Sequence, residues 1–334
     1  MTQYFDRQEI RAPRSRETAL MRDLRAILAI AKPRAQALRR QIKGIDIASL
    51  KTRADLAQIP LLRVRDLVNL QDEDPPFGGF AAARLGALKR LIVSAGPRFE
   101  PEGHARDWWG AARGLCAAGF GRNDIVLNCF SYHLAAEGFV MESGASALGC
   151  AVIPAGPDDP ELQLEVIHVL RPTAFCGRLD FLLSLVERAR RRNMKIASIK
   201  RCLVADTHLS PRLRGELESE GLSLRQAYCV PHLGVVAYES DDHNGTLNEG
   251  LIVNEGLILE IVVPGTGEPV AAGEIGEIVV TRLNPDYPLL RFATGQLSAL
   301  LPGMSPCGRT NLRLQGILGP VAQVEQVERA RMTA

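Results

Sequence analysis

The feature that most constrains the fold is a regular alternation of short apolar runs and amphipathic segments in the middle of the chain. Four apolar runs have the length and composition of buried strands: 124–130, 150–156, 173–177 and 199–206. The segments that follow them have helical spacing: 137–147, 160–169, 179–191 and 211–220. Strand and helix in strict succession predict right-handed βαβ units, and hence a mainly parallel sheet with helices on both faces.

The flanking regions have different patterns. Residues 1–89 predict a helical extension and connector, with Ser15 as N-cap of a helix that has Leu20, Leu24 and Leu28 on one face and is interrupted near Pro33. Turn signals beyond residue 228 separate β-rich segments, which predicts a smaller, mostly antiparallel region. We therefore expect an α/β fold organised as extension 1–89, α/β core 90–227, β-rich subdomain 228–319 and tail 320–334.

Composition and charge narrow the class of protein. Because 40 basic and 38 acidic residues leave a net charge of +2 without a continuous basic track, we expect no nucleic-acid partner. The sequence has no signal peptide and no run of 18 apolar residues, which predicts a cytoplasmic protein without a membrane partner. Seven scattered cysteines, none in a C-x-x-C motif, are typical of small buried hydrophobes in a reducing compartment.

The stretch RLIVSAGPRFEPEG, residues 90–103, raises the question of a nucleotide site. It predicts a strand, a small-residue turn and a helix that begins near Asp107, an arrangement that exposes backbone N–H groups to phosphate. The turn has one glycine, Gly96, and no lysine, and Pro97 lacks an N–H donor. Two interpretations stay open: a loop that still holds a nucleotide, and a plain strand-to-helix turn.

Several segments together resemble the phenylacetate-coenzyme A ligases of the adenylate-forming superfamily: 4–17, 128–156, 265–297 and 305–316. The resemblance implies the large N-terminal domain of adenylate-forming enzymes. It also implies a two-step ligation, in which a carboxylic acid and ATP give an acyl adenylate and pyrophosphate, and coenzyme A then displaces AMP. The implied cofactors are ATP with Mg²⁺, and coenzyme A as co-substrate. The expected partner is a small carboxylic acid or an acyl thioester, with a homodimer left open.

The family's motifs, matched residue by residue, imply a nucleotide site on ten positions. They are Ser94, Gly96 and Arg98 in the phosphate loop, Ala205, Asp206 and Thr207 in the adenine-side loop, Tyr228 and His232 in the aromatic-plus-acid motif, and Arg291 and Gln296 in and near the ribose motif. His232 replaces an acidic Mg²⁺ ligand, and imidazole is a poor ligand for a hard cation. Gln296 replaces an aspartate, which leaves a neutral partner for the ribose hydroxyls. We therefore expect weakened nucleotide binding and assign no catalytic residue.

The same resemblance implies a substrate pocket. Its residues are Phe130, Tyr132, His133, Gly138, Pro154, Ala155 and Gly156. His133 is the candidate contact for a carboxylate, and a purely structural histidine is the alternative. Larger family members carry a zinc site of several cysteines and a histidine, whereas this sequence offers Cys307 with Ser240 nearby, so we predict no zinc and no other metal site.

The end of the chain leaves two functions open. The family continues into a mobile domain of roughly 100 residues that carries a lysine, and here Pro320 and Ala322 replace the implied arginine and hinge aspartate. One hypothesis is a relative with weak or lost ATP-dependent adenylation that binds a small acid, an acyl thioester or a partner protein. The other is an active ligase that uses a C-terminal domain from another chain.

Overall fold

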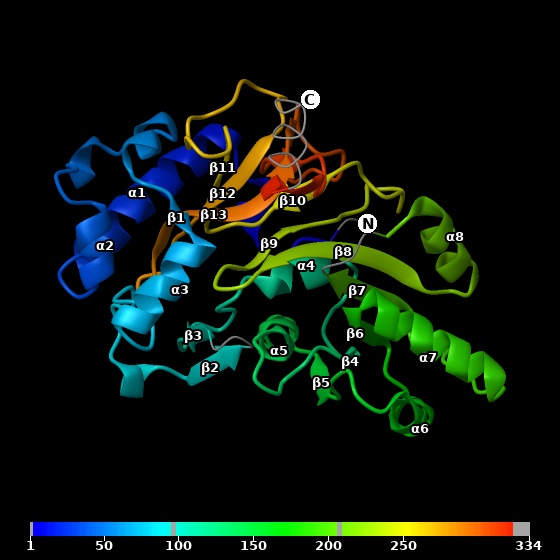
Figure 1. Cartoon of the computed structure of the whole chain (residues 1–334). Coiled ribbons are helices and arrows are strands. Elements are labelled where there is room, and N and C mark those ends of the chain that lie inside the picture. The colour runs from blue at the N-terminus through cyan, green and yellow to red at the C-terminus, as the bar shows by residue number, and fades with distance from the viewer. Residues whose placement is uncertain (1–2, 95–97, 206–208, 323–334) are drawn as a thin grey trace, which may run out of the picture.

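The computed structural model describes residues 3–94, 98–205 and 209–322. Within them, two large sheets and a two-stranded hairpin are packed with helices (Figure 1). The nine-stranded sheet has the order β14-β15-β10-β9-β8-β7-β6-β4-β5, and the five-stranded sheet has the order β1-β13-β12-β11 with β16 on β13. None of the described helices combines the length and the apolar character that a membrane span needs.

The parallel half of the larger sheet follows the sequence pattern. Its strands are β4 (Ile125–Asn128), β5 (Ala151–Pro154), β6 (Ala174–Arg178), β7 (Arg201–Ala205) and β8 (Ser223–Val230). The connecting helices are α5 (Glu137–Leu148), α6 (Pro160–Leu170), α7 (Leu179–Arg191) and α8 (Pro211–Ser219). All four strand pairs in this half are parallel, so the predicted succession of βαβ units is confirmed.

The β-rich region contributes to both sheets. From β8 the larger sheet continues in antiparallel fashion through β9 (Gly234–Tyr238), β10 (Leu251–Val253), β15 (Arg313–Leu314) and β14 (Leu300–Leu301). The second sheet contains β11 (Leu257–Val262), β12 (Gly276–Arg282), β13 (Leu289–Ser298) and β16 (Gly319–Pro320). The larger sheet therefore runs across residue 228 without a break.

The N-terminal helices cover the second sheet (Figure 1). They are η1 (Arg7–Ile10), α1 (Pro13–Ala31), α2 (Gln36–Gln41), η2 (Ile47–Ser49), η3 (Ala54–Gln58), α3 (Val64–Glu73) and η4 (Leu85–Ala87), with β1 (Leu62–Arg63) paired to β13. The expected stripe of α1 is buried against Ile258 and Leu290. Ser15 as its N-cap is wrong: the helix begins two residues earlier at Pro13, because proline is pre-organised for the first helical position.

The predicted strand of segment 90–103 is present, but a second strand follows it before the helix begins. β2 (Arg90–Ser94) pairs in antiparallel fashion with a second strand, β3 (Arg98–Glu102), and this hairpin is separate from the parallel sheet. The next helix, α4 (Ala111–Ala117), is capped by Asp107, whose carboxylate accepts hydrogen bonds from the N–H groups of the first two helical residues. Gly96 and Pro97 lie outside the described residues. The second strand turns the side chain of Glu100 toward the interior.

Candidate functional site

Two cavities lie near the carboxyl end of β8 and share the wall formed by residues 229–231. Cavity 1 has a volume of about 310 Å³, and cavity 2 of about 640 Å³. Ligands of open α/β sheets bind outside the carboxyl ends of the strands, because the strand-to-helix loops converge there. The position of the cavities is therefore that of a binding site.

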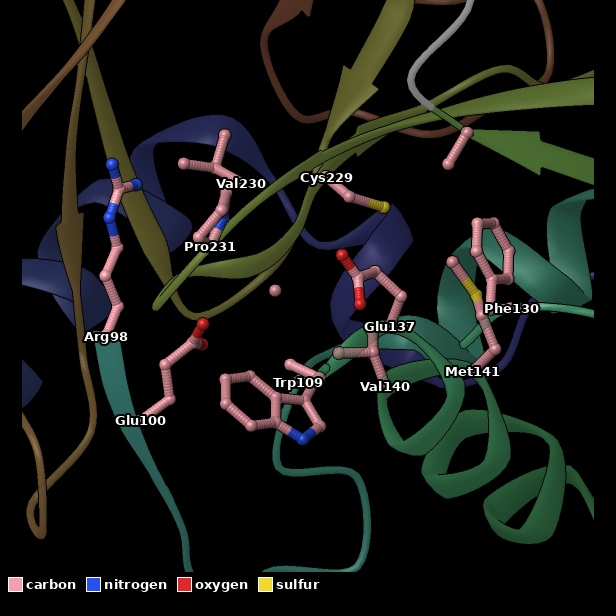
Figure 2. A pocket seen from close by; sticks show the side chains of 13 residues that line it. Arg98, Glu100, Trp109, Phe130, Glu137, Val140, Met141, Cys229, Val230 and Pro231 are labelled. Atoms are coloured by element: carbon pink, nitrogen blue, oxygen red, sulfur yellow. The ribbon is translucent and has the colours of Figure 1, made fainter. Parts of the chain in front are cut away.

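Most walls of cavity 1 are apolar (Figure 2). Its lining consists of Arg98, Glu100, Trp109, Phe130, Ala136, Glu137, Val140, Met141, Ala205, Cys229, Val230, Pro231 and Gly234. Helix α5 supplies Glu137, Val140 and Met141, whose spacing of three and four residues places them on one helix face. Phe130 follows β4, and Trp109 precedes α4.

Three side chains of charged residue types interrupt this apolar lining. Arg98 and Glu100 come from β3, and Glu137 comes from the first turn of α5. Glu100 is 2% exposed and accepts a hydrogen bond of 2.8 Å from the backbone N–H of His232. Within the described parts of the chain, Arg98 and Glu137 form no ion pair.

Arg282 of β12 holds the neighbours of Trp109 and Pro231, two residues that line cavity 1. Its guanidinium donates to the carbonyl oxygens of His232 (2.6 Å) and Trp108 (2.7 Å). It also lies 4.9 and 5.0 Å from the ring centres of Trp108 and Trp109. Burial lowers the pKa of Arg282 to about 10, and the carboxylate of Glu100 opposes that shift. The second sheet thereby supports the turn between β8 and β9.

The ring of His232 packs in the core. Its Nδ1 lies 3.4 Å from the hydroxyl of Tyr287, and its ring also packs beside Phe292. Burial, with Arg282 and Arg98 nearby, lowers the pKa of His232 to about 3, so the imidazole is neutral. His232 lines neither cavity. A neutral nitrogen ligand buried in this way does not fit Mg²⁺, which requires oxygen.

Cavity 2 is more polar than cavity 1. Its lining consists of Gln226, Ala227, Tyr228, Cys229, Val230, Pro231, Glu239, Gly250, Leu251, Thr294, Gln296, Gln315, Gly316, Ile317 and Leu318. The bend at 294–296 is fixed locally, because the Thr294 hydroxyl donates to the carbonyl oxygen of Ile278 and the Gly295 N–H donates to Glu277. These contacts hold Gln296 at the cavity.

Residues 104–284, more than half of the chain, match the family model for AMP-binding enzymes. The chain belongs to this family. Its sequence is 28% identical over 321 residues to a phenylacetate-coenzyme A ligase of Thermus thermophilus, covering 92% of this chain and 71% of that one. It is 27% identical over 295 residues to a phenylacetate-coenzyme A ligase of Aromatoleum evansii, covering 83% of this chain and 63% of that one. The predicted resemblance is confirmed.

The fold has a close counterpart among solved structures. An open conformation of 2-hydroxyisobutyryl-CoA ligase, in complex with 2-HIB-AMP and CoA, superposes with a TM-score of 0.84 at 23% identity. The match covers 94% of this chain and 77% of that chain. The expected α/β fold of adenylate-forming enzymes is confirmed.

In this member of the AMP-binding family, the residues implied for the nucleotide are divided between the two cavities. Arg98 and Ala205 line cavity 1, while Tyr228 and Gln296 line cavity 2. Ser94 is the last residue of β2, and Gly96, Asp206 and Thr207 lie outside the described residues.

Arg291 lies away from the two cavities. Its buried guanidinium pairs with Glu260 at 3.1 Å and donates to the backbone carbonyl oxygens of residues 57, 59 and 267. These contacts join β13 to the N-terminal region and to the turn after β11. Its described contacts are therefore structural.

Of the residues implied for the substrate pocket, Phe130 lines cavity 1. The hydroxyl of Tyr132 accepts a hydrogen bond from Asn128 at 2.7 Å, and burial raises the pKa of Tyr132. His133 is exposed. A Cβ on Gly138 would lie 2.8 Å from the carbonyl oxygen of residue 131, so glycine allows α5 to approach this loop. Pro154 is the last residue of the edge strand β5, and Ala155 and Gly156 follow it. None of these three residues lines either cavity.

The sequence interpretation did not place Trp109, Glu100, Glu137 and Met141 at a site. Trp108 and Trp109 are both buried, and Trp109 also borders cavity 1. Glu142, five residues after Glu137 on the same helix, lies 3.8 Å from Arg90. One sequence signal could have placed the α5 residues at a site. Glu137, Val140 and Met141 have the i, i+3, i+4 spacing of residues that share one helix face.

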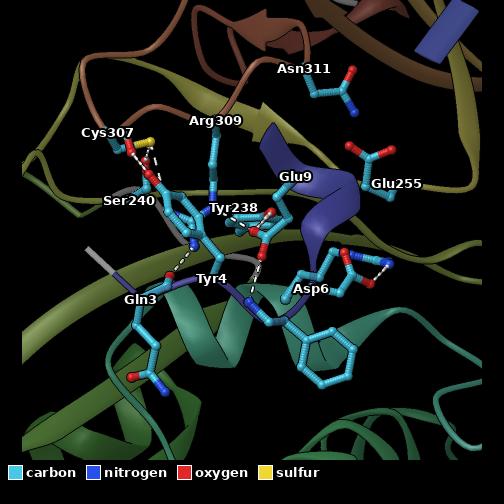
Figure 3. Close-up of polar contacts among 12 residues, drawn as sticks. Gln3, Tyr4, Asp6, Glu9, Tyr238, Ser240, Glu255, Cys307, Arg309 and Asn311 are labelled. Carbon is cyan, nitrogen blue, oxygen red and sulfur yellow. Dashed lines mark hydrogen bonds and ion pairs between the residues drawn. The ribbon is translucent and has the colours of Figure 1, made fainter. Parts of the chain in front are cut away.

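A buried polar cluster joins the N-terminal segment to the loop before β15 (Figure 3). Glu9 accepts hydrogen bonds from Arg309 (2.6 Å) and the Tyr238 hydroxyl (3.0 Å). The Ser240 hydroxyl lies 3.4 Å from the sulfur of Cys307. Burial raises the pKa of Cys307, but hydrogen bonds from serine and arginine neighbours lower it more, so its pKa is below the ordinary value. The described residues contain no group of three or more potential His, Cys, Asp or Glu ligands for a metal.

Proposed function

We propose that this chain is a phenylacetate-CoA ligase-like member of the AMP-forming acid-CoA ligases that binds a carboxylic acid in cavity 1 and an adenine nucleotide in cavity 2, with weak or lost ATP-dependent adenylation. The observation that carries the proposal is the wall shared by the two cavities at residues 229–231. An acid and a nucleotide placed on either side of one short wall are close enough to meet at its edge.

Cavity 2 offers the groups that a nucleoside needs. The ring of Tyr228 provides an aromatic surface, and the amide of Gln296 provides a hydrogen-bond partner for a hydroxyl. Because Gln296 is neutral, its hydrogen bond lacks the strength of a charge-assisted one. Weak nucleoside binding is the expected consequence.

The phosphate side of the site favours weak or lost turnover. The stretch that resembles the phosphate loop lacks a lysine and places the buried carboxylate of Glu100 in cavity 1. A carboxylate opposes the approach of phosphate groups, and the cost is large where water is excluded. Bound Mg²⁺ would offset this repulsion, but His232 offers nitrogen and not the oxygen ligand that Mg²⁺ prefers.

The second candidate is an active ligase that forms an acyl adenylate and then an acyl-CoA, with a C-terminal domain supplied in trans. The well-formed apolar cavity 1 favours it, since such a cavity suits an aromatic or medium-chain acid. The chain covers 58% to 71% of the lengths of the four phenylacetate-coenzyme A ligases that it resembles.

Calorimetric titration with AMP and with ATP, each with Mg²⁺, tests the proposal, together with Gln296→Asp. We expect AMP to bind at least as tightly as ATP, and Gln296→Asp to tighten AMP binding about tenfold because it restores a charged partner. The matched control is Gln36→Asp, on an exposed position of α2. Absence of AMP binding in both wild type and Gln296→Asp would contradict a nucleotide site. Exchange of pyrophosphate into ATP with any acid would establish the active ligase.

A further inference from the structure

Helix α6 has an apolar face that no described part of the chain covers. Leu162, Val169 and Leu170 are 54%, 72% and 49% exposed, and Val166 is half-buried. Their spacing places these four residues on one side of the helix, which we call the outer stripe. A second face of the same helix packs in the core. The helix is therefore apolar on two sides, whereas a surface helix needs one apolar face.

The outer stripe lies at an edge of the nine-stranded sheet. Among the described strands β5 is the last of that sheet, and α6 follows it directly (Figure 1). None of the four residues lines either cavity. Single apolar side chains are ordinary on a protein surface, but a contiguous apolar stripe indicates an interaction face.

The charges around the outer stripe are separated by sign. Asp158 and Asp159 precede the helix, Arg171 follows it, and all three are exposed. The exposed Arg122 lies at the same end as Arg171, because α6 runs back from the end of β5 to the start of β6, and the Arg122 side chain lies beside Gly149 at the start of β5. Within the described residues neither arginine forms an ion pair. One end of the stripe is therefore acidic and the other is basic.

A second copy of this chain complements both features. A two-fold axis perpendicular to α6 makes the two helices antiparallel, so the acidic end of each stripe lies against the basic end of the other. The helix dipoles also attract each other in this arrangement. A two-fold axis along the helices would instead bring acid to acid and base to base.

We propose that the outer stripe is a self-association face, through which two copies of this chain form an antiparallel, two-fold dimer. Val166 lies near the middle of the stripe and hence near the axis, so Leu162 faces the partner's Leu170. The helix is about 16 Å long, which makes the interface small. We therefore expect a dissociation constant on the order of 10 µM. This inference goes beyond the proposed function and depends on neither cavity.

Sedimentation velocity on the full chain, from about 1 to about 200 µM, tests the proposal. We expect the average mass to rise from that of a monomer toward that of a dimer as the concentration increases. Val169→Glu should keep the chain monomeric, with association at least about tenfold weaker, because the interface would remove water from an unpaired carboxylate. The matched control is Ile30→Glu, since Ile30 is also the penultimate residue of its helix and is 50% exposed. This control should associate like the wild type.

A charge exchange tests the antiparallel arrangement. Arg171→Asp should weaken the dimer about fivefold, because two-fold symmetry repeats each lost contact. Aspartate tolerates the left-handed backbone of residue 171, where φ is 48°. Adding Asp158→Arg to the same chain should restore the affinity, since opposite charges then face each other again.

Each outcome decides the inference. A chain that stays monomeric over the whole concentration range overturns it, and so does a dimer that survives Val169→Glu or that is lost equally in Ile30→Glu. Failure of the double variant to recover the affinity lost in Arg171→Asp overturns the antiparallel arrangement. Circular dichroism of each variant serves as the control for folding, because all of the changed side chains are exposed.

Discussion

Arg282 and His232 are joined by a hydrogen bond of 2.6 Å, from the guanidinium of one to the backbone carbonyl oxygen of the other. They are 50 residues apart and belong to different parts of the fold: Arg282 ends β12 in the five-stranded sheet, and His232 lies between two strands of the nine-stranded sheet. The bond therefore ties the two sheets together next to Pro231, which lines cavity 1.

Replacing Arg282 with lysine should destabilise the protein. A single ammonium cannot reproduce the planar fork that donates to two carbonyl oxygens and lies against two indole rings. We expect the free energy of unfolding to fall by about 2–4 kcal/mol in urea titrations. The control Arg212→Lys, on the exposed face of α8, should change it by less than about 0.5 kcal/mol. Equal effects of the two substitutions would refute a special role for Arg282.

Burial of His232 predicts a loss of stability in acid. In the unfolded chain the imidazole binds a proton below its ordinary pKa of 6.5, whereas the folded protein resists protonation until about pH 3. The unfolded state thus holds more protons between these values, and stability falls by about 1.4 kcal/mol for each pH unit below 6.5.

The substitution His232→Asn removes this titration and tolerates the left-handed backbone, where φ is 68°. Free energies of unfolding at pH 7 and pH 4.5 should therefore differ less in the variant than in the wild type. His104→Asn, at an exposed histidine, is the control and should follow the wild type. If the His232→Asn variant kept the pH dependence of the wild type, another group would be responsible for the loss of stability in acid.

Gly144 sets the distance between α4 and α5. A Cβ at this position would lie 2.6 Å from the Cβ of Ala111 and 2.7 Å from its backbone carbonyl carbon, closer than packed atoms can approach. Gly144→Ala should cost about 1–3 kcal/mol of stability and weaken ligand binding in cavity 1, because α5 carries part of its wall. Gly215→Ala, in helix α8 with open space around it, should be neutral or stabilising by up to about 1 kcal/mol. Thermal unfolding of both variants gives the comparison, and a neutral Gly144→Ala would contradict the close approach.

The ion pair of Glu9 with Arg309 should hold the N-terminal segment in place. Both side chains are 1% exposed, so Glu9→Gln leaves a buried guanidinium without its carboxylate. We expect a loss of about 3–5 kcal/mol and faster hydrogen exchange in residues 3–11. Glu187→Gln, which removes an exposed partner of Arg191, should leave the exchange of that segment unchanged. Unaltered exchange in Glu9→Gln would mean that other contacts hold the segment.

The hairpin at 90–102 shows why local patterns left part of the site unpredicted. The apolar run before Ser94 identified one strand, but Pro101 made a following strand a poor expectation, since proline is confined to edge strands. Among the described strands β3 pairs with β2 alone and is such an edge, and Gln71 of α3 fixes it by exchanging two hydrogen bonds with the backbone of Phe99. That contact spans 28 residues and has no local signature.

What the sequence by itself determined is the succession of βαβ units, the burial of the α1 stripe and the resemblance to phenylacetate-coenzyme A ligases. These depend on periodicities of two and 3.6 residues and on motifs contained in single segments. Only the tertiary structure decided which side chains share a cavity. Glu100 meets the N–H of His232 across 132 residues, and Arg98 and Glu137 line one cavity from a hairpin and a helix. Contacts of this kind depend on how whole elements pack against each other, and packing is fixed by the combined shape of many side chains rather than by the pattern of any one segment.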